Sequence, residues 1–376
     1  MQRITEGSAT IENETAKVVS KDLPVFYNPV MRHNRDITLL LLAALVKGQK
    51  RHWQCCDLMA GSGIRSIRML KEIPDAIEHV TINDYDAESN KRLQKNLKKN
   101  DIKFATWTIN DFIEHSLKVE GPGGRDGGVI LPKVLVSQLD ASQLLLSSNG
   151  YDYIDIDPFG SPNPFLDASM KRLSRGGILA VTATDTSALA GSYPDACVRK
   201  YWALPCEGPR MHEVGLRILI RKVQLVGAQY QKALTPVLAY NKDHYYRIFF
   251  AVEKGKKKCD ELIKQHGRWE DEAKAGPLWL GTFTDAKVID KMLKFMETNE
   301  KKGTLELEEP EKVRALLELL KEENKFKTIP HYIFLNDLNK KAKKKMTKAE
   351  LLKKLGKDGS PTHHHGNAIK SAKKLI

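Results

Sequence analysis

The amino-acid sequence predicts a doubly wound, Rossmann-like α/β domain followed by a smaller, mainly helical C-terminal domain. Short apolar runs alternate with amphipathic segments between residues 52 and 184. This alternation is typical of a parallel sheet with helices on both faces. The small residues Ala60 to Gly63 follow the first apolar run, as a turn between a strand and a helix requires. Beyond residue 285 the chain is rich in lysine and its apolar spacing is helical.

The expected elements follow from the same periodicity. They are helices over 32–47, 64–71, 87–99, 164–175 and 213–230, and strands over 52–58, 79–83, 151–156, 178–184, 237–240 and 245–252. The last two strands predict an antiparallel pair that closes one edge of the sheet. The glycine-rich stretch 121–128 predicts a surface loop. A charged break near 254–275 divides the chain into an expected catalytic domain, 1–265, and a basic C-terminal domain, 266–376.

The charge of the chain predicts a polyanionic partner. The formal net charge is +14 over 376 residues. The last forty residues contain twelve lysines against only three carboxylates. Basic excess concentrated in this way is typical of proteins that bind nucleic-acid phosphates.

The remaining composition narrows the class of protein. The apolar run 37–46 is too short to cross a bilayer. The N-terminus has no pattern of a secretory signal, so we expect a cytoplasmic protein without a membrane span. The five cysteines are scattered and form no C-x-x-C pair, so we expect neither zinc nor another metal. We also expect a monomer.

The first expected strand ends at a candidate cofactor site. Asp57 precedes the small-residue turn, and Asp84 follows the second strand. Dinucleotide sites need a third glycine where this chain has Ser66. A cationic, phosphate-free cofactor such as S-adenosyl-L-methionine instead suits the Asp57 carboxylate, and Asp84 is placed to bind ribose hydroxyls. For the adenine, spacing leaves two acidic candidates open, Asp111 and Asp140.

The sharpest motif begins where the strand 151–156 ends. Asp157, Pro158 and Phe159 follow one another there. An acidic residue, a proline and an aromatic residue in this order suit methyl transfer to an exocyclic amine. The Asp157 carboxylate and the Pro158 carbonyl can accept from the two N–H groups, and Phe159 can stack on the base. The motif therefore predicts a nucleic-acid methyltransferase.

Taken together, these segments resemble the tRNA guanine-N2 dimethyltransferases, a family that modifies guanine 26 of tRNA. The resemblance extends over nearly the whole chain. Its segments are 24–29, 34–36, 61–65, 83–84, 157–162, 181–185, 212–215, 242–247 and 277–281.

The resemblance implies more than the spacing does. It implies that Asp157 is catalytic and that Phe26 and Phe159 surround the guanine. It assigns to the cofactor the residues Arg35, Arg65, Asp84, Asp140 and Ala141, which favours Asp140 over Asp111. It also implies two successive methylations of one nitrogen, and a winged-helix-like C-terminal domain that holds tRNA.

Two other functions compete with this interpretation. One is an N6-adenine nucleic-acid methyltransferase, but those enzymes usually carry a second aromatic residue where this chain has Phe159-Gly160. The other is an inactive RNA-binding protein, which the intact Asp157, Asp84 and Arg65 argue against.

Overall fold

The computed structural model describes residues 2–13, 27–46, 52–119, 131–268, 274–326, 332–341 and 345–373. The glycine-rich stretch 121–128 lies outside these residues. Two compact units make up the chain. Unit 1 contains residues 1–181 and 294–313, and unit 2 contains residues 182–293 and 314–376. The predicted domain boundary at residue 265 stays a prediction.

Unit 1 is built on parallel strands. They are β3 (Trp53–Asp57), β4 (Ile77–Asn83), β5 (Ala105–Thr106), β6 (Val134–Ser137), β7 (Tyr151–Ile156) and β8 (Leu173–Ala183). Their order is β5-β6-β4-β3-β7-β8, and neighbouring strands run parallel. The chain reverses its direction of winding between β3 and β7. Open α/β sheets bind ligands at such a switch point, beyond the carboxyl ends of the strands.

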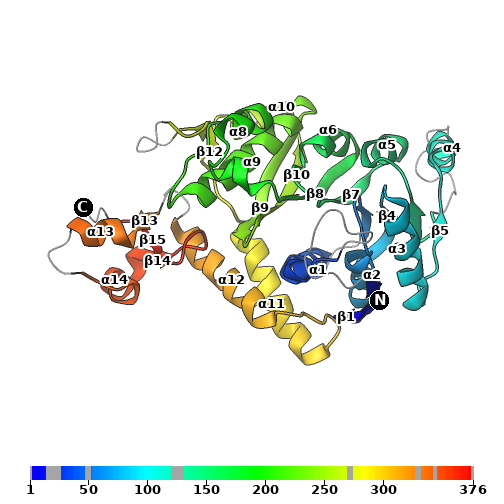
Figure 1. Ribbon diagram of the computed structural model, residues 1–376, viewed down its shortest axis with the longest axis horizontal. Helices are drawn as coiled ribbons and strands as arrows, with labels where there is room; N and C mark the ends of the chain where they lie inside the picture. The colour runs from blue at the N-terminus through cyan, green and yellow to red at the C-terminus, as the bar shows by residue number, and fades with distance from the viewer. Residues whose placement is uncertain are drawn as a thin grey trace. The chain divides into compact units, whose positions relative to one another are not determined.

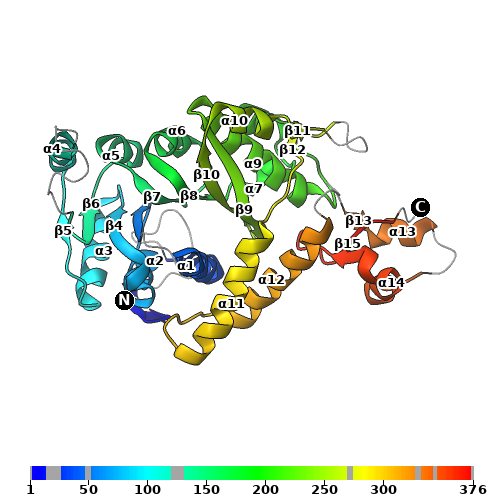
Figure 2. The ribbon, with the colours of Figure 1, turned by 180° about the vertical axis from the view of Figure 1, so that it is seen from behind.

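Helices cover both faces of these strands. Those of unit 1 are α1 (Arg32–Val46), α2 (Ile64–Glu72), α3 (Ala87–Lys99), α4 (Ile109–Val119), α5 (Ala141–Ser147) and α6 (Asn163–Arg172). Figures 1 and 2 show α2 and α3 on one side of β3, β4 and β7, and α5 and α6 on the other. The Asp86 side chain caps α3 by accepting from Ser89 N at 2.8 Å. The predicted doubly wound fold is thereby confirmed.

One predicted helix is too long. The expected helix 164–175 ends at Arg172, and Leu173 already pairs with Tyr151 of the neighbouring strand. Two glycines follow in the new strand. Gly176 has φ +76°, and a Cβ on Gly177 would lie 2.7 Å from Asp152 O. The backbone at Gly177 thus lies too close to β7 for a side chain, a tertiary contact that the local spacing does not reveal.

A hairpin that the sequence did not predict begins unit 1. It consists of β1 (Gln2–Glu6) and β2 (Ala9–Asn13). Glu6 is fully buried and accepts from Arg68 Nη1 at 3.0 Å. Arg68 also pairs with Asp36 and Glu72, at 2.7 Å and 2.8 Å. This buried ionic network ties the hairpin to α1 and α2.

Unit 2 begins where the sheet turns antiparallel. The predicted strand pair is present as β9 (Lys232–Lys242) and β10 (Tyr245–Lys254), and the sheet order ends β8-β10-β9. Around it lie α7 (Thr186–Leu189), α8 (Pro194–Tyr201), α9 (Met211–Gln229), α10 (Lys256–Ile263), β11 (His266–Gly267) and β12 (Leu278–Trp279). Helix α9 packs against β9, and α7 and α8 pack against α9.

The C-terminal part combines helices with a small sheet. The helices are α11 (Ala286–Lys302), α12 (Pro310–Glu323), α13 (Leu335–Lys341) and α14 (Lys348–Leu355). The strands β13 (Ile333–Phe334), β14 (Gly359–Pro361) and β15 (Ala368–Ser371) form an antiparallel sheet of order β13-β15-β14. Its core contains Leu335, Leu338, Leu351, Leu355 and Ile369. Strands of two to four residues give little periodicity, so the apolar spacing predicted only the helices of this part.

Across the described residues, no helix is both long and apolar enough to cross a membrane.

Candidate active site

The turn after β3 contains two glycines with positive φ and is hydrogen-bonded to the residue that follows β4. Gly61 and Gly63 have φ of +54° and +77°, a left-handed conformation that favours glycine. The Gly61 N–H donates to Asp84 Oδ2 at 2.7 Å. A Cβ on Gly63 would lie 2.2 Å from Leu93 Cδ1. The turn therefore has one fixed shape at the carboxyl edge of the sheet, and Asp84 belongs to it.

Asn83 fastens three strand ends, a role that the sequence did not predict. Its Nδ2 donates to Leu58 O at 3.0 Å and to Leu139 O at 2.9 Å. Its Oδ1 accepts from Ser137 Oγ at 2.8 Å. Asn83 is fully buried, so these bonds satisfy an otherwise unfavourable polar group. The ends of β3, β4 and β6 are thereby held at fixed spacing.

Asp57 is buried at the end of β3. Its Oδ2 accepts from Ser66 Oγ of α2 at 2.8 Å. Burial raises the pKa of Asp57 to about 6, although the nearby Arg65 opposes that shift. Ser66 stands where a dinucleotide-binding motif has its third glycine. Its hydroxyl thus positions Asp57, the carboxylate that we expected at the cofactor.

Arg65 brings the strand-end carboxylates together. Its Nη1 lies 2.7 Å from Asp155 Oδ1, and its Nη2 is hydrogen-bonded to Asp157 Oδ2. Tyr153 Oη donates to Asp155 Oδ2 at 2.5 Å. The sequence predicted Arg65 and Asp157 but gave no role to Asp155 or Tyr153. Strand alternation places 153, 155 and 157 on one face of the chain, and this was the available signal.

The Asp-Pro-Phe motif directly follows β7, and its Asp157 contacts Arg65. The Asp157 side chain is 16% exposed, so it is partly accessible to solvent. Pro158 is buried, whereas Phe159 is 51% exposed. Two residues after the partly exposed Asp157, the chain thus carries an exposed aromatic side chain.

The two acidic candidates for the adenine differ in their surroundings. Asp140 caps α5, and its Oδ1 accepts from Ser142 N at 2.9 Å, with the buried Ala141 between them. Asp111 is exposed on α4 and accepts from Thr108 N at 2.7 Å. Asp140 directly follows Leu139, which Asn83 bonds to the ends of β3 and β4. Its place beside those strand ends supports Asp140, which remains a prediction.

Arg35 is hydrogen-bonded to residues other than Arg65 and its two carboxylate partners. Arg35 is buried, and its Nε and Nη2 donate to Glu6 at 2.6 Å and 2.5 Å. Its Nη2 also donates to Asn28 O at 3.2 Å. A cofactor role for Arg35 therefore stays a prediction. Phe26 lies outside the described residues.

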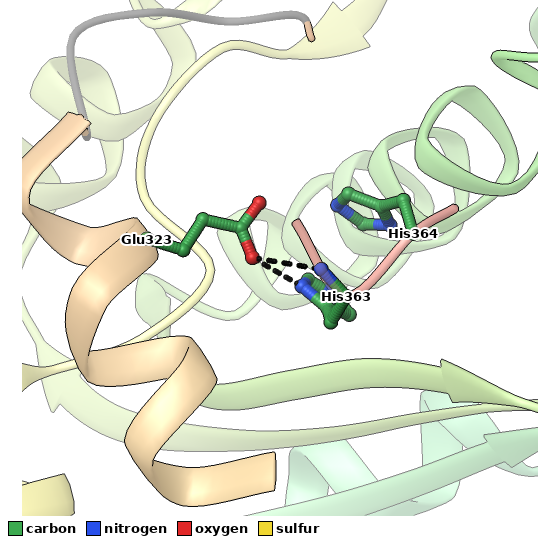
Figure 3. Close-up of side chains that lie close together, drawn as sticks. All are labelled: Glu323, His363 and His364. Atoms are coloured by element: carbon green, nitrogen blue, oxygen red, sulfur yellow. Dashed lines mark hydrogen bonds and ion pairs between the residues drawn. The ribbon is translucent and has the colours of Figure 1, made fainter. Parts of the chain in front are cut away.

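A second cluster of titratable side chains lies in unit 2 (Figure 3). Glu323 accepts from Thr362 Oγ1 at 2.7 Å and contacts His363 Nδ1 at 2.5 Å, and Lys370 Nζ lies 3.4 Å away. His363 and Lys370 outweigh burial and hold the pKa of Glu323 well below its usual value. His364 Nδ1 bonds instead to Asn241 Oδ1 at 3.0 Å. The Glu323 carboxylate at the end of α12 is thus paired with Lys370 of β15 and with Thr362 just after β14. The cluster therefore links these strands to α12. The absence of a metal stays a prediction.

Comparisons with known proteins agree with this geometry. A family model described as N2,N2-dimethylguanosine tRNA methyltransferase matches residues 7–274 and 269–375. A tRNA (guanine(26)-N(2))-dimethyltransferase of Thermococcus kodakarensis is 39% identical over 307 residues, which cover 77% of this chain and 76% of that protein. A tRNA (guanine(26)-N(2)/guanine(27)-N(2))-dimethyltransferase of Aquifex aeolicus is 34% identical and covers 91% of this chain and 86% of that protein.

The solved structure of Trm1 from Pyrococcus horikoshii, in complex with S-adenosyl-L-methionine, has a similar fold. It superposes with a TM-score of 0.82 at 29% identity and covers 100% of this chain and 98% of that chain. The chain therefore belongs to the N2,N2-dimethylguanosine tRNA methyltransferase family.

Proposed function

We propose that this protein transfers two methyl groups in succession from S-adenosyl-L-methionine to N2 of guanine 26 in tRNA. The observation that carries the proposal is the partly exposed Asp157 carboxylate at the carboxyl end of β7, next to the switch point of the sheet. Family membership supports the reaction, and the relatives' names support the nitrogen and position 26.

The residues at the switch point fit this cofactor. Arg65 Nε is buried and has no hydrogen-bond acceptor among the described residues. The carboxylate of a methionyl group would supply that acceptor. Asp57 and Asp84 offer carboxylates beside the turn, suited to a cationic group and to ribose hydroxyls. We assign Arg35, Asp140 and Ala141 to the same cofactor on the resemblance of the chain to its family.

The protein's part in the reaction is to orient a weak nucleophile. The cofactor supplies an electrophilic methyl group. Asp157 accepts a hydrogen bond from the guanine amine, and the Pro158 carbonyl accepts from the second N–H. Phe159, and in our proposal Phe26, hold the base by stacking. Fixing the amine in line with the methyl carbon is the main catalytic contribution.

Asp157 also accounts for the proton. An exocyclic amine is not basic, so it must lose a proton as the new N–C bond forms. Asp157 is the acceptor in contact with that amine. Arg65 holds the Asp157 carboxylate before the base arrives. A guanine opposite Asp157 would have to leave its base stack, as other base-modifying enzymes require.

We further propose that residues 266–376 form the tRNA-binding domain and that one copy of the chain suffices. The five cysteines are scattered along the chain and form no C-x-x-C pair, which supports a protein without zinc. A tRNA substrate supports the further proposal that the protein acts in the cytoplasm.

The test is product identification. The full-length protein is incubated with an unmodified tRNA transcript and labelled S-adenosyl-L-methionine, and the digested nucleosides are identified. We expect dimethylguanosine from position 26. The Asp157→Asn variant should lose at least a hundredfold in rate and still bind the cofactor. A tRNA with adenosine at position 26 is the matched control and should accept no methyl group. Methyladenosine as the product would overturn the proposal in favour of an adenine methyltransferase.

A further inference from the structure

An exposed tryptophan in unit 2 has an unusual setting. Trp202 follows α8 and is 46% exposed. Its φ of +58° is left-handed, which is a rare conformation for a bulky residue. Its carbonyl accepts from Arg221 Nη1 at 3.2 Å. Backbone strain of this kind persists only where the surroundings hold it, and such positions gather at functional sites.

The inner face of the Trp202 ring covers a buried lysine. Lys222 Nζ lies 2.9 Å from the ring centroid, and Lys222 is 6% exposed. The ammonium is thus held by the π-face of the indole. Trp202 as a whole is nevertheless 46% exposed, so a part of it that does not cover Lys222 is accessible to solvent.

Among the residues that the structure describes, no carboxylate neutralises the charge beneath the ring. Within the described parts of the chain, neither Arg221 nor Lys222 pairs with a carboxylate, and Arg221 Nε is buried without an acceptor. Burial, together with Arg221, lowers the pKa of Lys222 to about 8. Burial and Arg268 lower the pKa of Arg221. Burial thus disfavours the charged form of both side chains.

We propose that Trp202, Arg221 and Lys222 form a docking site for one unpaired nucleotide of the tRNA. The base would stack on the outer face of Trp202, and the phosphate would bind next to the half-buried Arg221, while Lys222 supports the ring from beneath. An aromatic face next to uncompensated cations is the combination that single-stranded nucleic acid recognises. The identity of the partner rests on the proposed function, whereas the location of the site rests on these contacts. An acidic peptide would satisfy the charge but not the ring.

The experiment measures the affinity of the full-length protein for an unmodified tRNA transcript at several salt concentrations. Trp202→Leu keeps an apolar cover over Lys222 but removes the aromatic face. We expect it to bind tRNA about ten- to a hundredfold more weakly, with an unchanged salt dependence. Trp202→Phe should restore most of the affinity. Arg221→Gln should weaken binding and reduce the slope of log affinity against log salt by roughly one.

Arg175→Gln is the matched control. Arg175 is an exposed arginine at the amino end of β8, on the opposite edge of the sheet from the active site. It should leave both affinity and slope unchanged. Methyl transfer at saturating tRNA should also be unchanged in Trp202→Leu, because only docking is affected.

Wild-type affinity in Trp202→Leu, or an unchanged slope in Arg221→Gln, would overturn the docking site. So would a polyglutamate peptide that competes with tRNA at equal charge concentration. These outcomes leave the proposed function intact as long as the wild type makes dimethylguanosine. Failure of the wild type to methylate any tRNA would instead overturn the proposed function.

Discussion

Arg65 Nη1 lies 2.7 Å from Asp155 Oδ1, while the same guanidinium is paired with Asp157. Asp155 is fully buried, and Asp157 is partly exposed. The buried carboxylate therefore anchors the arginine, and the arginine positions the carboxylate that faces the substrate. Asp155 acts on the reaction through Arg65 and is a positioning residue.

Replacing Asp155 with asparagine tests this role. The amide keeps the size of the side chain but removes the charge that balances Arg65. Arg65 would then be drawn more strongly to Asp157, which competes with the guanine amine for the same carboxylate. We expect kcat to fall about ten- to a hundredfold, with a smaller change in KM for tRNA. Single-turnover rates and the thermal unfolding midpoint check this.

Tyr153→Phe is the matched control, because it removes only the hydrogen bond to Asp155 and leaves its charge. It should reduce kcat by less than about fivefold. Equal losses of activity and of thermal stability in both variants would show that Asp155 only maintains the fold.

Glu6 makes the stability of unit 1 sensitive to acid. Burial raises its pKa, but Arg35 and Arg68 together lower the pKa to about 2 from an ordinary value of 4.5. A lowered pKa means that the native state favours the ionised form. The contribution is therefore complete above about pH 4.5 and disappears as the pH falls towards 2. It amounts to about 3 kcal/mol.

We expect Glu6→Gln to lower the free energy of unfolding by about 3 kcal/mol at pH 7 and by much less near pH 2.5. Urea unfolding at both pH values measures the difference. Glu12→Gln is the control, because Glu12 lies on the adjacent strand but pairs with Lys99 at the surface. It should have little effect at either pH. A Glu6→Gln difference that is the same at both pH values would contradict the assignment.

The turn at the cofactor site predicts a contrast between two glycines. Gly63 and Gly176 have φ of +77° and +76°, so an alanine at either position meets the same left-handed strain. At Gly63 the new Cβ would also lie 2.2 Å from Leu93 Cδ1, whereas nothing lies within 4 Å at Gly176. We expect Gly176→Ala to cost about 1–2 kcal/mol. Gly63→Ala should cost a further 1–3 kcal/mol or so, from overpacking.

Calorimetric titration with S-adenosyl-L-methionine extends this comparison. Gly63→Ala should weaken binding because the turn must shift, and Gly176→Ala should not. Equal unfolding free energies for the two variants would mean that Leu93 yields without cost and that the turn is not fixed by packing.

The sequence predicts the parts of the site that local patterns encode. Strands β3, β4 and β7 and helix α3 lie close to their expected positions, because their apolar spacing and the Asp86 cap are local signals. The Asp157 motif was found for the same reason. Asp155 was missed because it lies in an apolar strand and because its partner, Arg65, is far away in the chain.

The same limit explains the hairpin β1–β2. Glu6 is buried only because Arg35 and Arg68 meet it there, and no local periodicity reports a contact across that separation. The helix expected to continue to Arg175 failed at Leu173 for a related reason. Pairing with β7 overrode the local preference there. Local sequence patterns therefore did not predict features that depend on contacts between segments far apart in the chain.

The basic C-terminal segment predicts a salt-dependent contribution to tRNA binding. Lys353, Lys354 and Lys357 are exposed at the end of α14 and just beyond it. Deleting the segment would remove Leu351 and Ile369 from a hydrophobic core, so substitution is the sharper test. We expect the triple change to glutamine to weaken tRNA binding and to reduce the salt slope by about two to three, because each phosphate contact releases about one counterion.

If only the net charge of the protein mattered, lysines removed from any surface would change tRNA binding equally. A triple change of Lys91, Lys95 and Lys98 to glutamine removes the same charge from the exposed side of α3, in unit 1. If the C-terminal lysines contact phosphates, only their removal reduces the salt slope by about one for each lost contact. The α3 lysines should leave the slope unchanged, because charges farther than about 8 Å from a phosphate are screened at physiological salt. Equal slopes in the two triple variants would show that the C-terminal lysines act only through the total charge of the protein. Filter binding between 50 and 200 mM salt, roughly the range over which phosphate contacts change affinity most, distinguishes the two.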